Sequence, residues 1–572
     1  MTLRLRPLTL PLIVVLLLAG CGGGGGGGGS STPPSSGGSG FPANGACTPS
    51  TPAPVPTAAL PAGQVYVTGV AQAQIVGDNL SSGALDYSAT TCKPIRAAVV
   101  ELLDANGTIL LSTKTDSSGN FAGAVPANTS VRVRVKAQMV DTSGPSWNVT
   151  VRDNTNSNAL YALDSALFNS TTANVVQNVT AGYGWDGSSY SSPRASGPFA
   201  ILDTVYRAMQ QVLTASPNAA FPALTVYWSV NNVSASPTNI SAGQISTTYF
   251  TQDGSGNRAI YVLGKADNDT DEFDATVIAH EWGHYFQNVF SRDDSIGGAH
   301  SGGQLLDMRV AFSEGWGNAW SGMATNRSIY TDSNGPGQAS GFAINLAAGA
   351  ASNPGWFKES SVESILYNFY QGVGFGPIFA AMTGPLRTGE AVSSIHALGA
   401  SVAATSPANA AAFNTLAAGQ SITTSTDPLG SGEANGGGFG SGNSGAYTAL
   451  PLYKPYNLNT TVSYCLSSAN DAGSTKDNNK LGESQFLRFS VPTTRSYTVT
   501  VTGGYDPDFE VYQSPSGFVA GGFGSPAPGT APGGGSETGT VNLTAGTAVL
   551  VIQEANMANA GSPTPCYNVS VQ

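Results

Sequence analysis

The segment Asp274–Phe290 reads DATVIAHEWGHYFQNVF and contains the pattern HExxH at His280, Glu281 and His284. Its apolar residues recur at helical spacing, which predicts a helix with Asp274 at its cap or first turn. Residues four apart lie on one face of a helix, so both imidazoles can reach one metal ion. The carboxylate of Glu281 then lies beside the open coordination position, where it can accept a proton from bound water.

Chance does not account for this pattern. The chain has four His in 572 residues, and random placement gives roughly 6×10⁻⁴ occurrences of HExxH. A helix whose two histidines only hydrogen-bond to their neighbours is the alternative. That alternative leaves the glutamate between them unexplained, whereas Val277, Ile278 and Phe286 already supply the apolar packing face. We therefore interpret the segment as a zinc helix.

Catalytic zinc uses three protein ligands and a water, so a third ligand is required. The metzincin spacing is excluded because Gln287 and Phe290 occupy the positions of its Gly and His. The candidates are Glu314, in AFSEGWGNAW within a helix expected over 305–324, and His300, in the Gly-rich segment GGAHSGG. We favour Glu314, because a helix fixes a ligand better than a glycine-flanked loop does.

The motif HExxH followed by a Glu on a later helix resembles the gluzincin zinc metallopeptidases. HEWGHYFQN and SEGWGNAW are similar to motifs of the fungalysin-type peptidases in that class. The resemblance implies that His280, His284 and Glu314 bind one zinc ion and that Glu281 is the catalytic base. The chain departs from the pattern at Asn318, where gluzincins often carry an Asp that orients a zinc-bound His.

A peptidase also needs a hydrogen-bond donor for the tetrahedral oxyanion. No spacing rule selects among His300, His396, Tyr367 and Tyr370. The two tyrosines lie three residues apart in an apolar helix, which favours a core role for them. We name His396 as the candidate second catalytic residue, although a core or surface role suits it equally.

Two groups of acidic residues raise the prospect of a structural Ca²⁺ ion. They are Asp269, Asp271, Glu272 and Asp274, before the zinc helix, and Asp506 with Asp508 near the C-terminus. Negative charge near a helix N-terminus explains the first group as well. A turn is the favoured explanation of the second.

The flanking regions have strand patterns. Residues 63–155 alternate apolar and polar positions between Asn-Gly and Ser-Gly turns and resemble the small β-sandwich modules that accompany carboxypeptidases. Residues 451–572 contain SYTVTVTGGYDPDFEVY and TVNLTAGTAVLVIQE, which resemble the pre-peptidase C-terminal domain of secreted bacterial peptidases. Residues 156–450 mix helix and strand. We predict a multidomain protein with an α+β zincin-type peptidase domain flanked by N-terminal and C-terminal β-sandwich domains.

The N-terminus predicts export. Basic residues precede an apolar run over 8–19, too short for a comfortable membrane span. The sequence LAGC, ending at Cys21, resembles a bacterial lipobox. This implies a signal peptide over 1–20, a lipid on Cys21, and attachment to a bacterial membrane facing the periplasm or exterior. A plain signal peptide with an incidental cysteine is the alternative. Residues 21–62 are rich in Gly, Ser and Pro and suit a flexible tether.

The four remaining cysteines suit an oxidising compartment. Proximity along the chain favours the disulfides Cys47–Cys92 and Cys465–Cys566, although four cysteines allow three pairings.

The charge balance excludes nucleic acid as a partner, because 23 basic residues face 35 acidic ones and such binding requires a basic surface. We expect a lipid-anchored, zinc-dependent endopeptidase that acts on a protein or peptide substrate. The alternative is a surface adhesin, or a glycan- or protein-binding protein, with a vestigial peptidase domain. The sequence makes no prediction of oligomeric state.

Overall fold

The computed structural model describes residues 41–572, except 43–44, 50, 52, 440–446, 472–476 and 528. The expected signal peptide and the expected lipid attachment at Cys21 lie outside the described residues. Within the described part of the chain, none of the helices has the length and apolar character needed to cross a bilayer.

The chain divides into two compact units. Among the described residues, the N-terminal unit comprises 41–285 and Ser321–Ile344, and the C-terminal unit comprises Phe286–Trp320 and Asn345–Gln572. The division crosses two continuous helices, α2 and α3. These helices are Ala275–Phe290 and Met308–Thr325, close to the predicted 274–290 and 305–324.

Two β-layers form the first part of the N-terminal unit. In one, β2 (Gln64–Asp78) pairs with β3 (Leu85–Pro94) and β6 (Asn120–Pro126). In the other, β4 (Ala98–Asp104) pairs with β5 (Ile109–Lys114) and β7 (Ser130–Asp141). The layers meet closely at Gly123 of β6, where an added Cβ would lie within 3 Å of Leu102 and Leu111. The disulfide Cys47–Cys92 is present, as predicted.

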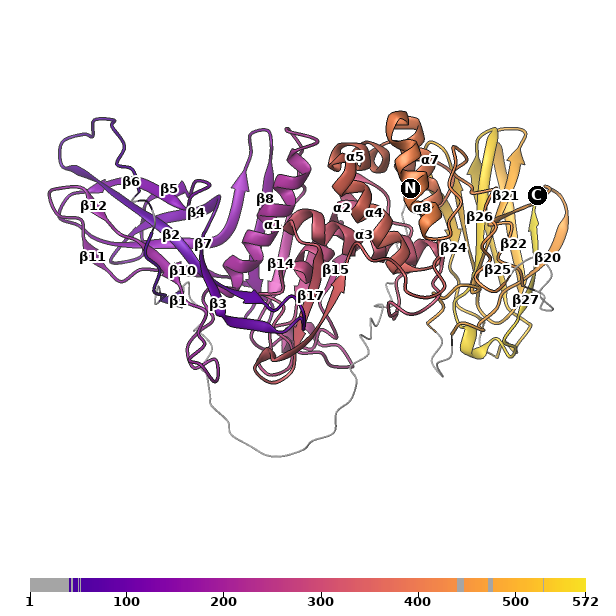
Figure 1. Ribbon diagram of the computed structural model, residues 1–572, viewed down its shortest axis with the longest axis horizontal. Helices are drawn as coiled ribbons and strands as arrows, with labels where there is room; N and C mark the ends of the chain where they lie inside the picture. The colour runs from indigo at the N-terminus through magenta and orange to yellow at the C-terminus, as the bar shows by residue number, and fades with distance from the viewer. Residues whose placement is uncertain are drawn as a thin grey trace, which may run out of the picture. The chain divides into compact units, whose positions relative to one another are not determined.

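The sheet that contains β7 continues beyond this sandwich. β8 (Trp147–Asp153) is antiparallel to β7 and parallel to β14 (Leu224–Trp228), which is followed by β16 (Arg258–Val262) and β15 (Tyr249–Gln252). Helix α1 (Gly197–Leu213) buries Ile201 and Val205 and packs against β7 and β8. One sheet therefore runs across residue 155, where the sequence analysis places a domain boundary (Figure 1).

Smaller strands complete the N-terminal unit. β17 (Ile329–Asn334) and β18 (Ser340–Asn345) form a hairpin that follows α3. The others are β1 (Phe41–Pro42), β9 (Ala159–Leu160), β10 (Ala162–Asp164), β11 (Phe168–Asn169), β12 (Val175–Val176) and β13 (Val179–Ala181).

Helices form the first part of the C-terminal unit. They are α4 (Glu359–Val373), α5 (Phe375–Thr383), α6 (Pro385–Thr388), α7 (Ile395–Thr405) and α8 (Ala410–Gly419). The Ala-rich stretch 391–418 therefore holds two helices. Pro407 lies between them, and its missing N–H interrupts a continuous helix. Phe286, at the end of α2, packs against Trp316 and Trp320 of α3, with ring centroids 5.2 and 5.5 Å apart.

A β-sandwich forms the rest of the C-terminal unit, drawn in orange to yellow in Figure 1. One sheet has the order β19 (Tyr453–Pro455), β21 (Ser484–Val491), β26 (Gly546–Glu554), β23 (Pro507–Gln513) and β24 (Gly517–Gly522). The other has the order β20 (Thr461–Cys465), β27 (Cys566–Val571), β22 (Arg495–Gly503) and β25 (Ser536–Leu543). Alternate residues such as Leu487, Val499 and Leu550 are fully buried between them. Cys465 and Cys566 are joined, as predicted.

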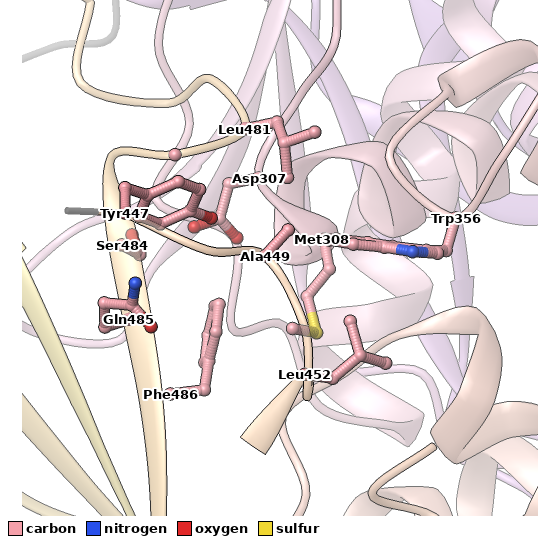
Figure 2. Close-up of a pocket in the computed structure, with 11 residues that line it drawn as sticks. Asp307, Met308, Trp356, Tyr447, Ala449, Leu452, Leu481, Ser484, Gln485 and Phe486 are labelled. Carbon is pink, nitrogen blue, oxygen red and sulfur yellow. The ribbon is translucent and has the colours of Figure 1, made fainter. Parts of the chain in front are cut away.

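The sandwich contacts the start of α3 within the same unit. Asp307 and Met308 line a small pocket with Ser484 and Phe486 of β21 (Figure 2). Next to it, the guanidinium of Arg309 is fully buried and donates to Asp307, to Ser484 and to Glu510 of β23. A buried charged network therefore ties the helix that carries Glu314 to the sandwich.

Candidate metal centre

Helix α2 presents two imidazoles on one face. The Nε2 atoms of His280 and His284 lie 3.1 Å apart. Two nitrogen ligands of a tetrahedral zinc ion, each at 2.0–2.1 Å from it, are separated by about 3.3 Å. The opposite side of α2 is apolar, with Ile278 and Phe286 fully buried. The packing of α2 thus fixes the two histidines at a spacing that suits zinc.

Glu314 of α3 completes a group of three ligand atoms. One atom from each of His280, His284 and Glu314 lies within 4.8 Å of the other two. Two imidazoles and one carboxylate are a donor set found in catalytic zinc sites. The residues present therefore fit a zinc ion in both distance and chemistry. Their assignment as zinc ligands stays a prediction.

Glu281 is held by the edge strand of the sheet. Its Oε2 accepts a hydrogen bond of 2.7 Å from the backbone N–H of Phe250 on β15, and the residue is 7% exposed. This contact fixes one carboxylate oxygen. No sequence pattern points to Phe250, because any residue except proline can supply a backbone N–H at that position.

His300 is a partner of Glu314. Its Nε2 lies 3.4 Å from Glu314 Oε2 and 3.7 Å from Glu359 Oε2, while its Nδ1 lies 3.1 Å from the carbonyl oxygen of Gly298. Burial disfavours the charged imidazole, but the two carboxylates outweigh this effect and raise the pKa of His300 to about 9. The group of three ligand atoms therefore includes Glu314 and not His300, the other candidate third ligand. His300 contacts the carboxylate of Glu314 instead.

Asn318, one turn after Glu314, faces two further carboxylates. Its Nδ2 donates to Glu359 Oε1 at 2.6 Å and to Glu363 Oε2 at 3.1 Å. Burial and the nearby Glu359 raise the pKa of Glu363 well above its usual value. An amide at this position supplies a proton donor where an Asp would add a further negative charge. This is a physical reason for the departure from the gluzincin pattern.

His396 is enclosed by protein. It is 1% exposed, and its Nε2 lies 2.8 Å from Glu433 Oε2. An imidazole that is buried in this way cannot donate a hydrogen bond to a substrate oxygen. We therefore do not propose His396 as a catalytic residue. Tyr367 is buried within α4 and Tyr370 is half-buried at its end. No oxyanion donor is assigned.

The acidic residues before α2 separate into two groups. Glu272 pairs with Arg194 and accepts a bond of 3.0 Å from Trp228 Nε1. Asp269, Asp271 and Asp274 instead group with Asp332 of β17, a residue that sequence reasoning missed. Its distance along the chain left no local signal.

Asp506 lies in the loop before β23, and Asp508 lies at the start of that strand. Burial, with Glu554 and Glu537 nearby, raises the pKa of Asp506 to about 6. Among the residues that the structure describes, no group of three metal-ligand atoms includes either residue.

Comparisons with known proteins give no family assignment. No family model matches the chain, and no curated protein matches it. Solved structures similar to parts of the chain include the pre-peptidase C-terminal domain of a collagenase from Bacillus anthracis, at 15% identity, 21% of this chain, 94% of that chain and a TM-score of 0.16. They also include a surface-associated copper-binding protein of Methylomicrobium album, at 11% identity, 21% of this chain, 98% of that chain and a TM-score of 0.15. At these scores neither likeness carries an argument about function.

Proposed function

We propose that this protein is a zinc-dependent endopeptidase in which His280, His284 and Glu314 hold the metal. The observation that carries the proposal is the grouping of their three ligand atoms within 4.8 Å. Glu281 directly follows His280 on the same helix, α2. Zinc bound by such residues lowers the pKa of a coordinated water and polarises a substrate carbonyl.

Glu281 is the proposed general base. One of its carboxylate oxygens accepts from Phe250 N–H, which orients the side chain so that the carboxylate can receive a proton from the attacking water. The same carboxylate then delivers that proton to the leaving amine. His300 holds the Glu314 carboxylate from the side, at 3.4 Å, and so positions a ligand without touching the substrate.

The test compares the full chain with its Glu281→Gln variant and with a Glu390→Gln control. The control makes the same chemical change at a half-buried glutamate after α6. Each protein is assayed for bound zinc and for cleavage of a denatured protein substrate. We expect the wild type and Glu390→Gln to cleave, and Glu281→Gln to retain zinc but lose at least 10²-fold in rate.

Two results would contradict the proposal. A folded wild type that binds no zinc would remove the metal site. A zinc-loaded wild type that cleaves no more than Glu281→Gln would favour the adhesin with a vestigial site.

We also propose export and lipid attachment through Cys21. The two disulfides support this, because such bonds persist in oxidising compartments. Replacing Cys21 with Ala should release the protein from the membrane fraction of the producing bacterium. Retention of the Cys21→Ala variant in that fraction would refute the lipid anchor.

A further inference from the structure

Four aspartates converge beside the start of α2. Asp269, Asp271 and Asp274 come from the segment that leads into the helix, and Asp332 comes from β17. One carboxylate oxygen from each lies within 4.8 Å of the others. All four residues belong to the N-terminal unit. The cluster is therefore formed by the fold, since β17 follows α3 in the chain.

Three of these carboxylates each keep a buried oxygen that has no hydrogen-bond partner. These are the Oδ1 atoms of Asp269, Asp271 and Asp274. Asp271 is 2% exposed and Asp274 is fully buried. A buried polar atom without a partner is energetically unfavourable, so its presence calls for a ligand or another compensation.

The other oxygens of the two most buried residues are anchored by protein donors. Asp271 Oδ2 accepts from Thr248 Oγ1, and Asp274 Oδ2 accepts from the N–H and hydroxyl of Ser333, at 3.2 and 2.7 Å. Each side chain is thus held by one oxygen and leaves the other available. This arrangement is typical of carboxylates that bind a metal ion, because the outer bond orients the inner oxygen.

Among the residues that the structure describes, no ion pair joins the cluster to a basic side chain. Two arginines of the same unit pair with other carboxylates: Arg194 binds Glu272, and Arg327 binds Asp78. Burial, reinforced by the neighbouring carboxylates, raises the pKa of Asp269, Asp274 and Asp332 well above the usual value. Glu272 lies outside the cluster and pairs with Arg194.

We propose that Asp269, Asp271, Asp274 and Asp332 form a Ca²⁺ site. Four carboxylates are an all-oxygen donor set, which hard divalent cations prefer. Calcium takes six to eight oxygen ligands, many of them carboxylates, whereas Mg²⁺ keeps several waters and is usually bound by one or two carboxylates. A cluster of four carboxylates therefore favours calcium.

This site stabilises the start of the helix that carries His280. Asp274 immediately precedes α2, and its backbone carbonyl oxygen accepts hydrogen bonds from the N–H groups of Val277 and Ile278 at 3.0 and 3.2 Å. Asp332 lies two residues after Tyr330, whose ring centroid is 6.2 Å from that of His280. An ion shared by these aspartates joins β17 to the first turn of α2.

The experiment uses the full chain, stripped of metal and given one equivalent of zinc. Calcium chloride is then titrated, and binding is followed by equilibrium dialysis and by thermal unfolding. We expect about one further ion per chain and a saturable rise in the melting temperature, with Mg²⁺ at least tenfold less effective.

The test variant is Asp332→Asn, with Asp116→Asn as a control in an exposed turn. Asp332→Asn should bind calcium at least tenfold more weakly, keep its zinc, and melt at or above the wild type without calcium, because one repulsive charge is gone. If it fails to fold, Asp269→Asn repeats the test. Asp116→Asn should match the wild type.

A wild type that binds no calcium, or an Asp332→Asn or Asp269→Asn variant that binds it normally, would overturn the site. Glu281→Gln should bind calcium like the wild type. Failure of the peptidase proposal is therefore distinguishable from failure of this one.

Discussion

The Nε2 atom of His300 lies 3.4 Å from Oε2 of Glu314. The same imidazole is anchored at Nδ1 by the carbonyl oxygen of Gly298, at 3.1 Å. His300 therefore links the Gly-rich loop before α3 to the carboxylate proposed as the third zinc ligand. Partners of this kind orient ligands and are commonly worth 10–100-fold in metal affinity.

Replacing His300 with Ala should lower zinc affinity by about 10–100-fold, because Glu314 loses a donor that fixes its orientation. Competition with a chromophoric chelator measures the change. His300→Gln is the matched control, since its amide can still donate to the carboxylate, and it should lose less. Equal affinity of wild type and His300→Ala would refute the positioning role.

Asn318→Asp should destabilise the C-terminal unit at neutral pH. The amide now donates to Glu359 and Glu363, and an Asp would remove both bonds and bring a third carboxylate to them. We expect a loss of about 3 kcal/mol in the free energy of unfolding. Asn318→Ala removes the bonds without adding charge and should lose about 1–2 kcal/mol. Urea unfolding measures the free energy of unfolding of both variants. An Asn318→Asp protein as stable as the wild type would refute this explanation.

Glu510→Gln should loosen the contact between α3 and the C-terminal sandwich. Glu510 Oε2 accepts from the buried Arg309 at 2.8 Å and from Tyr512 at 3.0 Å. Losing this charged hydrogen bond costs about 1–3 kcal/mol, because Asp307 still pairs with the buried guanidinium of Arg309. Thermal unfolding and limited proteolysis should both show this loss. Glu537→Gln is the control: it makes the same chemical change at a half-buried glutamate on β25 and should behave like the wild type.

The sequence predicted local features well. The helix over 274–290 and its HExxH motif depend on periodicity within one segment, and α2 is observed over Ala275–Phe290. Both disulfides were also predicted from proximity along the chain. Each of these features is decided by residues close in sequence, or by pairing within one region.

Contacts between distant segments could not be predicted. Asp332 joins the acidic cluster from β17, and Glu272 leaves it because Arg194, 78 residues earlier, binds it. The pairing of β8 with β14 carries one sheet across the expected boundary at residue 155. No local pattern marks such contacts, because they depend on how the strands assemble.

Lys454 gives a prediction about pH. Its Nζ donates to the carbonyl oxygen of Thr448 at 2.6 Å and lies 5.9 Å from the ring centroid of Tyr447. Burial lowers the pKa of Lys454 to about 8. Between about pH 8 and the unfolded-state pKa near 10.4, the unfolded chain holds a proton that the folded chain has released, so stability attributable to this group rises with pH.

Lys454→Met removes that titration while keeping most of the side-chain volume. At about pH 7 both states of the wild type carry the charge, and the folded state bears its desolvation cost, so the variant should be more stable. The advantage should shrink between about pH 8 and pH 10 as the folded wild type loses its proton. Melting temperatures across this range measure the difference, with the half-buried Lys136→Met as a control that removes a lysine paired with Glu101. A difference between Lys454→Met and the wild type that is independent of pH would show that the charge of Lys454 is not the cause.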